Sequence, residues 1–110
     1  MKLLSIVAGI TASLAATTFA LAQEAGDPVA GKRLAEQLCA KCHALPGAVM
    51  SGFVAPNLVA VAKMPSTTGL SLHVFLQTPH AKMPNYQFSR AEMDDVIAYI
   101  LSLKQAPDRP

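Results

Sequence analysis

A Cys-x-x-Cys-His sequence at residues 39–43 strongly constrains how this chain can fold. Two cysteines at this spacing are compatible with a disulfide, half of a zinc site, a redox dithiol or the two attachment points of a covalent cofactor. A tetrahedral zinc site needs four ligands, and the chain has only these two cysteines. His73 and His80 would have to complete it, but their separation is wider than zinc-finger spacing. Zinc is therefore the least favoured of these interpretations.

Residues 1–22 are typical of a secretory signal peptide. Lys2 precedes an apolar run, and the run ends in Ala-Leu-Ala, the small-x-small pattern that signal peptidase accepts. The run is shorter than a membrane-spanning helix usually requires, and no basic stop follows it. We therefore expect cleavage, a mature chain of residues 23–110, and no stable membrane insertion afterwards.

The mature chain would be small and nearly neutral. Cleavage leaves 88 of the 110 residues, which is enough for one domain but not for two. Domains of this size have a marginal hydrophobic core and commonly add a disulfide, a metal or a large cofactor. Eight Lys and Arg face seven Asp and Glu. This balance argues against nucleic acid and against an anionic membrane surface as the partner.

In an exported chain, the order Cys-x-x-Cys-His favours covalent haem attachment. Cys39 and Cys42 would form thioethers with the haem, and His43 would follow at the position from which an imidazole reaches the iron. A thioredoxin-like dithiol is the next alternative, but that fold needs alternating strands and helices, and few segments resemble strands. The motif predicts one haem c, with His43 as an axial ligand.

A low-spin haem iron needs a sixth ligand, for which the chain offers several methionines and histidines after the motif. The candidates are Met50, Met64, His73, His80, Met83 and Met93. Lys-Met-Pro occurs twice, around Met64 and around Met83. Prolines at 79 and 84 make the second copy part of an extended loop, where an axial thioether is expected. Met64 and His80 remain alternatives.

Both ends of the mature chain are predicted to be helices. Asp27 and Pro28 form a typical helix start, and apolar residues recur at helical spacing from there to the first cysteine. Ser89 and Glu92 form a capping box before the last helix. Met93 falls on the apolar face of that helix, which favours a place in the core over a role as a ligand.

A shorter helix is predicted between these two. Thr67 or Thr68 caps it, and Pro79 stops it. Its apolar face consists of Leu72, Phe75 and Leu76.

The segments GKRLAEQLCAKCH, APNL, FLQTPHAKMPN and AEMDDVIAYILSL, in that order, resemble the class I, mitochondrial-like c-type cytochromes of bacteria over residues 27–104. The resemblance implies an all-α cytochrome c fold, in which three to four helices surround one covalently bound haem. The first and last helices would cross near Gly31. It also implies that Met83 is the second axial ligand and that the carbonyl of Pro56 orients His43.

These features together predict a soluble periplasmic one-electron carrier and not an enzyme. A monomer would take electrons from a dehydrogenase or reductase and pass them to an oxidase. The alternative is a haem c enzyme subunit or gas sensor with an open or labile sixth position. Lys41 and Lys82 are expected at the rim of the exposed haem edge, where they would attract an acidic partner.

Overall fold

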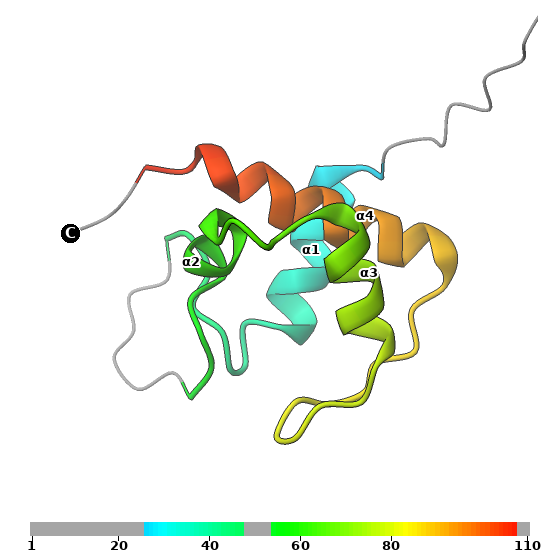
Figure 1. Cartoon of the computed structure of the whole chain (residues 1–110). Helices are drawn as coiled ribbons and strands as arrows, with labels where there is room; N and C mark the ends of the chain where they lie inside the picture. Colours follow the sequence, from blue (N-terminus) through cyan, green and yellow to red (C-terminus); the bar gives the residue numbers. More distant parts are fainter. Residues whose placement is uncertain (1–25, 48–53, 108–110) are drawn as a thin grey trace, which may run out of the picture.

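The computed structural model describes residues 26–47 and 54–107 (Figure 1). The predicted signal peptide at residues 1–22 and the candidate ligand Met50 lie outside the described residues. The elements are α1 (Pro28–Leu38), α2 (Leu58–Lys63), α3 (Gly69–Gln77), α4 (Arg90–Ser102) and a 3-10 turn, η1 (Leu103–Gln105). The described part of the chain contains no strand beyond an isolated bridge. The all-α prediction is confirmed.

Local sequence signals set the starts of the long helices as predicted. At α1, the Asp27 carboxylate accepts the amide of Val29 at 2.8 Å, and Pro28 occupies the first helical position. At α4, the Ser89 amide donates to the Glu92 carboxylate at 2.8 Å, while the Glu92 amide donates to Ser89 Oγ at 3.3 Å. These side chains satisfy amides that have no partner within a helix.

The first and last helices cross at Gly31 (Figure 1). A Cβ atom at this position would collide with the main-chain carbonyl of Asp95 and lie 2.9 Å from Cβ of Tyr99. At the same crossing, the Asp27 amide donates to Asp95 Oδ1 at 2.6 Å. Ala35, one turn beyond Gly31, is fully buried. The predicted crossing is confirmed, and the two backbones approach closely because residue 31 has no side chain.

The hydrophobic core is built along α4, against which α1, α2 and α3 all pack. Its buried members are Ala35, Leu45, Leu58, Ala62, Leu72, Met93, Val96, Ile97, Tyr99, Ile100 and Leu103. Met93 is 3% exposed, which confirms its predicted place in the core.

The three apolar residues predicted on one face of α3 lie in this helix at helical spacing, but they are buried to different extents. Leu72 is buried and Leu76 is half-buried, but Phe75 is 45% exposed. The Phe75 ring instead stacks on His80, with ring centroids 3.7 Å apart and planes inclined by 25°. The pattern defines a stripe on the helix, whereas the packing of α4 against one side of α3 decides how much of that stripe is buried.

A short helix that the sequence patterns do not predict, α2, lies between the Cys-x-x-Cys-His motif and α3 in the sequence. Asn57 begins α2 by accepting the amide of Val59 at 2.7 Å, and η1 packs against this helix. Thr68 and Ser71 then form a capping box at α3, which confirms one of the two predicted caps. Within residues 26–47 and 54–107, no helix has both the length and the apolar character needed to cross a membrane.

Candidate functional site

Cys39 ends α1, and the chain continues in tight helical turns through the motif. The Cys39 amide donates to the carbonyl of Ala35 at 2.8 Å. The amides of Cys42 and His43 both donate to the carbonyl of Cys39, at 3.1 and 2.8 Å. Both cysteines are free thiols and half-buried. The turns therefore keep two thiols and one imidazole together at the end of a helix that is itself fixed by its crossing with α4.

The pKa of the Cys39 thiol is shifted in the direction opposite to that of a reactive redox cysteine. Burial raises its pKa, because desolvation disfavours the thiolate. The attacking cysteine of a Cys-x-x-Cys oxidoreductase has a lowered pKa, since the thiolate is the reactive form. The raised pKa of Cys39 and the absence of strands other than an isolated bridge among the described residues both favour haem attachment over the thioredoxin-like alternative.

His43 contacts the main-chain carbonyl that the resemblance implies. Its Nδ1 lies 2.6 Å from the carbonyl oxygen of Pro56, 13 residues further along the chain. A carbonyl oxygen only accepts hydrogen bonds, so Nδ1 carries the proton and donates it. In the neutral ring this leaves the lone pair on Nε2, the arrangement found in histidines that bind metals.

Two main-chain hydrogen bonds flank the contact between His43 and Pro56. The Ala55 amide donates to the carbonyl of Cys42 at 3.2 Å. The Leu58 amide donates to the carbonyl of Ala44 at 3.0 Å. The residues before and after His43 are thus bonded to the segment that carries its acceptor, so the Pro56 carbonyl is held beside the imidazole.

The loop between α3 and α4 makes a tight turn (Figure 1). Met83 lies in this turn, where it pairs with His80. Its amide donates to the carbonyl of His80 at 3.4 Å, and the two residues form an isolated bridge. Lys82, the third residue of this turn, has a φ of 67°, in the left-handed region that few side-chain-bearing residues adopt. Met64, in contrast, ends α2 as its C-cap and is 47% exposed. The two Lys-Met-Pro copies therefore differ in structure. The second lies in a loop, as predicted, but in a tight turn of that loop and not in extended backbone.

The loop that carries Met83 is bonded to the end of α1. The Tyr86 hydroxyl donates to the carbonyl of Leu38 at 3.1 Å. This carbonyl belongs to the last turn of α1, where carbonyls have no partner within the helix. The contact joins residues 48 positions apart, so no local sequence pattern indicates it.

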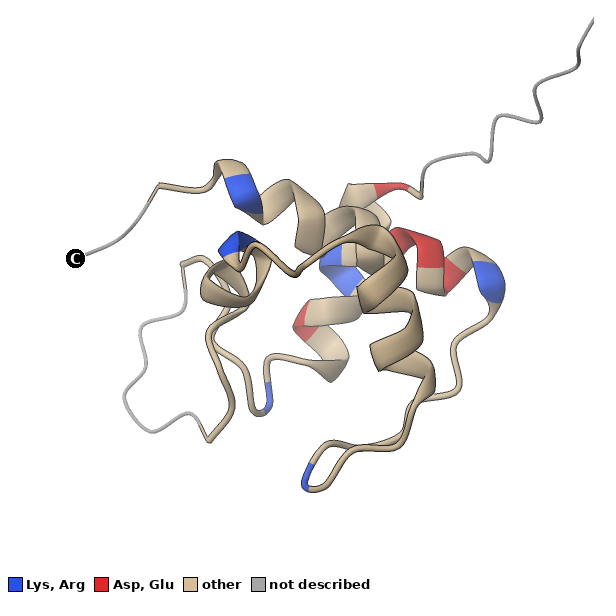
Figure 2. Cartoon of the chain, in the orientation of Figure 1, with Lys and Arg blue, Asp and Glu red and all other residues tan. Residues whose placement is uncertain are grey.

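Among residues 26–47 and 54–107, acidic residues lie only on the two crossing helices and at the N-cap of α1 (Figure 2). Residues 37–91 contain no Asp or Glu. This span includes the motif, α2, α3 and the Met83 loop. Lys41, between the two cysteines, and Lys82, next to Met83, are both exposed. Both lysines therefore lie in the part of the chain without negative charge.

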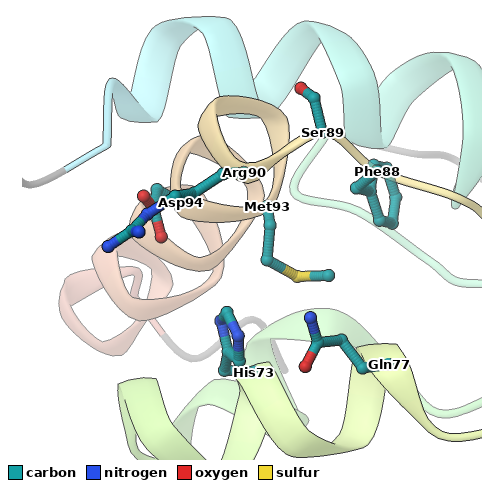
Figure 3. A pocket seen from close by; sticks show the side chains of 7 residues that line it. All are labelled: His73, Gln77, Phe88, Ser89, Arg90, Met93 and Asp94. Atoms are coloured by element: carbon teal, nitrogen blue, oxygen red, sulfur yellow. The ribbon is translucent and has the colours of Figure 1, made fainter.

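A hollow of about 390 Å³ lies between α3 and the start of α4 (Figure 3). It is lined by His73, Gln77, Phe88, Ser89, Arg90, Met93 and Asp94. His73 and Met93 point into it from α3 and α4, respectively. None of the residues of the Cys-x-x-Cys-His motif lines this hollow. His73 and Met93, two of the candidate ligands, thus lie where α3 packs on α4.

A family model described as Cytochrome C oxidase, cbb3-type, subunit III, matches residues 26–100. The match includes the motif, the Met83 loop and most of both crossing helices. The chain belongs to this family of c-type cytochromes. The cytochrome is also 36% identical over 96 residues to Cytochrome c-552 of Bradyrhizobium diazoefficiens, an alignment that covers 86% of this chain and 89% of that protein. No solved structure matches the cytochrome.

Family membership implies that the cytochrome covalently binds one haem c with its iron. It also indicates an electron carrier that has redox partners. The residues at the end of α1 fit this cofactor, because they provide two free thiols and an imidazole whose Nε2 is available. The individual roles of Cys39, Cys42, His43 and Met83 stay predictions.

Proposed function

We propose that the cytochrome is a monomeric one-electron carrier of the bacterial periplasm and not an enzyme. Cys39 and Cys42 hold the haem through thioethers, and His43 is one axial ligand. The haem, when attached, supplies an iron that alternates between the ferrous and ferric states. The contact between His43 Nδ1 and the Pro56 carbonyl carries this proposal, because it sets the ring orientation and directs the free lone pair to Nε2.

Met83 is proposed as the second axial ligand. Its turn in the loop after α3 and its half-buried side chain support this choice over the more exposed Met64. A thioether and an imidazole together leave no position open for a substrate or a gas, which favours a carrier over an enzyme subunit or sensor. A thioether also gives a higher reduction potential than a second imidazole.

Export rests on the signal peptide predicted at residues 1–22. A protein purified from the periplasm should begin at Gln23, as determined by its intact mass. A mass that retains the first 22 residues would contradict cleavage.

Met83→Leu is expected to remove the weak band at the red edge of the ferric spectrum, which reports a bond between methionine sulfur and iron. The loss follows because leucine has no donor atom, and the opened position should then bind CO in the ferrous protein. Met64→Leu is the matched control and should keep the band and exclude CO. Loss of the band in Met64→Leu alone would assign the ligand to the first Lys-Met-Pro copy.

Lys41→Glu combined with Lys82→Glu is expected to slow electron transfer from the physiological donor about tenfold at low ionic strength, because opposite charges speed encounter. The reduction potential should change little. At about 1 M salt, where charges are screened within a few ångströms, the rates should converge. Rates are measured by stopped-flow reduction of the ferric protein.

The control for this pair reverses two cations elsewhere on the surface. Lys32→Glu with Arg33→Glu changes the net charge equally, but on α1, among the acidic residues. If the two double variants slow electron transfer equally, the effect comes from net charge, and the proposal that Lys41 and Lys82 dock the partner is wrong.

A further inference from the structure

The Met83 loop is attached to the helices on both sides of its turn. Three residues after Met83, the Tyr86 hydroxyl donates to the Leu38 carbonyl at 3.1 Å. Tyr86 is half-buried, and its ring lies 6.0 Å from that of Phe88. This attachment joins the loop to the residue immediately before Cys39, at the site itself.

Three residues before Met83, His80 provides the other attachment. Its ring stacks on Phe75 of α3, with centroids 3.7 Å apart. The His80 carbonyl also accepts the Met83 amide at 3.4 Å. The aromatic stack therefore joins α3 to the same turn that presents the methionine.

The turn itself is not in a conformation that the chain adopts freely. Lys82 has a φ of 67°, which costs a residue with a Cβ atom about 1 kcal/mol relative to ordinary backbone. The loop has few hydrogen bonds of its own, namely the Met83 amide to His80 and the Tyr86 amide to Pro84, at 3.2 Å. Contacts outside the loop must hold this arrangement.

We propose that Tyr86 and His80 are positioning residues for the Met83 thioether. The proposal rests on the His43 and Met83 ligation proposed above. A thioether is a neutral and weak donor to iron. Its binding in competition with other ligands therefore depends on how well the protein holds it at the axial position. Anchors on both sides of the turn raise the local concentration of the sulfur at the axial position.

The test uses the ferric haem protein, titrated with imidazole while the red-edge methionine band is recorded. Tyr86→Phe keeps the ring and removes only the hydrogen bond to Leu38. Imidazole should displace the methionine at an about fivefold lower concentration, the factor expected for one neutral hydrogen bond. The band should remain at its wild-type position before imidazole is added.

Ser102→Ala is the matched control. The Ser102 hydroxyl donates to the Tyr99 carbonyl at 2.6 Å, at the end of α4, so this variant also loses one hydroxyl-to-carbonyl bond. Both variants should unfold at similarly lowered denaturant concentrations, but only Tyr86→Phe should shift the imidazole midpoint. Equal midpoints for the two variants would overturn the positioning role.

His80→Leu tests the second anchor. It removes the stack on Phe75 while leaving the carbonyl that accepts the Met83 amide, and it should lower the imidazole midpoint about fivefold, as expected for one aromatic pair. An unchanged midpoint would overturn the role of His80. If the wild-type protein lacks the methionine band and His80→Leu loses the low-spin spectrum, His80 itself is the ligand and the positioning role is overturned.

Met83→Leu in the same titration separates the two proposals. A band that persists in Met83→Leu shows that the ligand assignment is wrong. A band that is lost in Met83→Leu, with a wild-type midpoint in Tyr86→Phe, shows that the ligand is right and the anchor wrong.

Discussion

Cys39→Ala combined with Cys42→Ala is expected to abolish covalent retention of haem. The wild-type pigment should stay with the polypeptide through acid-acetone extraction, and the intact mass should exceed that of the chain by one haem. The double variant has no thiol left, because these are the two cysteines of the chain. Any haem it binds would pass into the organic phase.

The amount of mature protein should fall as well. The core of so small a domain is marginal, and the cofactor is a large part of what the helices surround. We expect the double variant to accumulate several-fold less, as destabilised chains do in cells. Gln37→Ala, at an exposed position on the same helix, is the control and should keep both haem and yield. Haem that resists extraction from the double variant would disprove thioether attachment at these cysteines.

Gly31→Ala is expected to lower the free energy of unfolding by about 3 kcal/mol, at the upper end of the usual cost of overpacking. The new methyl group would overlap the main-chain carbonyl of Asp95 and come within 2.9 Å of Tyr99 Cβ. Backbone atoms cannot rotate out of the way, so the two helices must separate along the crossing. The measurement is guanidinium unfolding of the haem protein, followed by helical circular dichroism.

Gly69→Ala provides the comparison, because it adds the same methyl group at a helical position with room for it. The nearest atoms to the new Cβ would be Leu101 Cδ1 at 3.8 Å and Ile97 Cγ2 at 3.9 Å, which are ordinary van der Waals contacts. This variant should be neutral or more stable by up to about 1 kcal/mol, since alanine is the better helix former. Equal losses at Gly31 and Gly69 would contradict close packing at the crossing.

Features of the fold that depend on neighbouring residues were predictable from the sequence. Asp27 with Pro28, and Ser89 with Glu92, identify helix starts because the capping partners lie within three residues of each other. The short helix α2 was not predicted, since six residues are too few for a clear periodicity. Its one local signal is the Asn57 cap.

Features that depend on contacts between distant residues were predictable only where a family resemblance supplied them. The contact between His43 and Pro56 follows from the resemblance, and Gly31 at the crossing is implied by it too. The hydrogen bond from Tyr86 to Leu38 is not implied by the resemblance. It depends on how a loop packs against the end of a helix 48 residues away in the sequence. Phe75 shows the same limit, since periodicity does not reveal which side of α3 is covered.

The hydrogen bond from the Asp27 amide to Asp95 indicates when, during synthesis of the chain, α1 and α4 can pack together. Its two residues are 68 positions apart, so the crossing of α1 and α4 cannot form until nearly the whole chain has been synthesised. Until then α1 has no partner for its apolar face, and the cysteines at its end lie outside any packed structure. We therefore expect both thiols to be accessible to haem before the helices close around it.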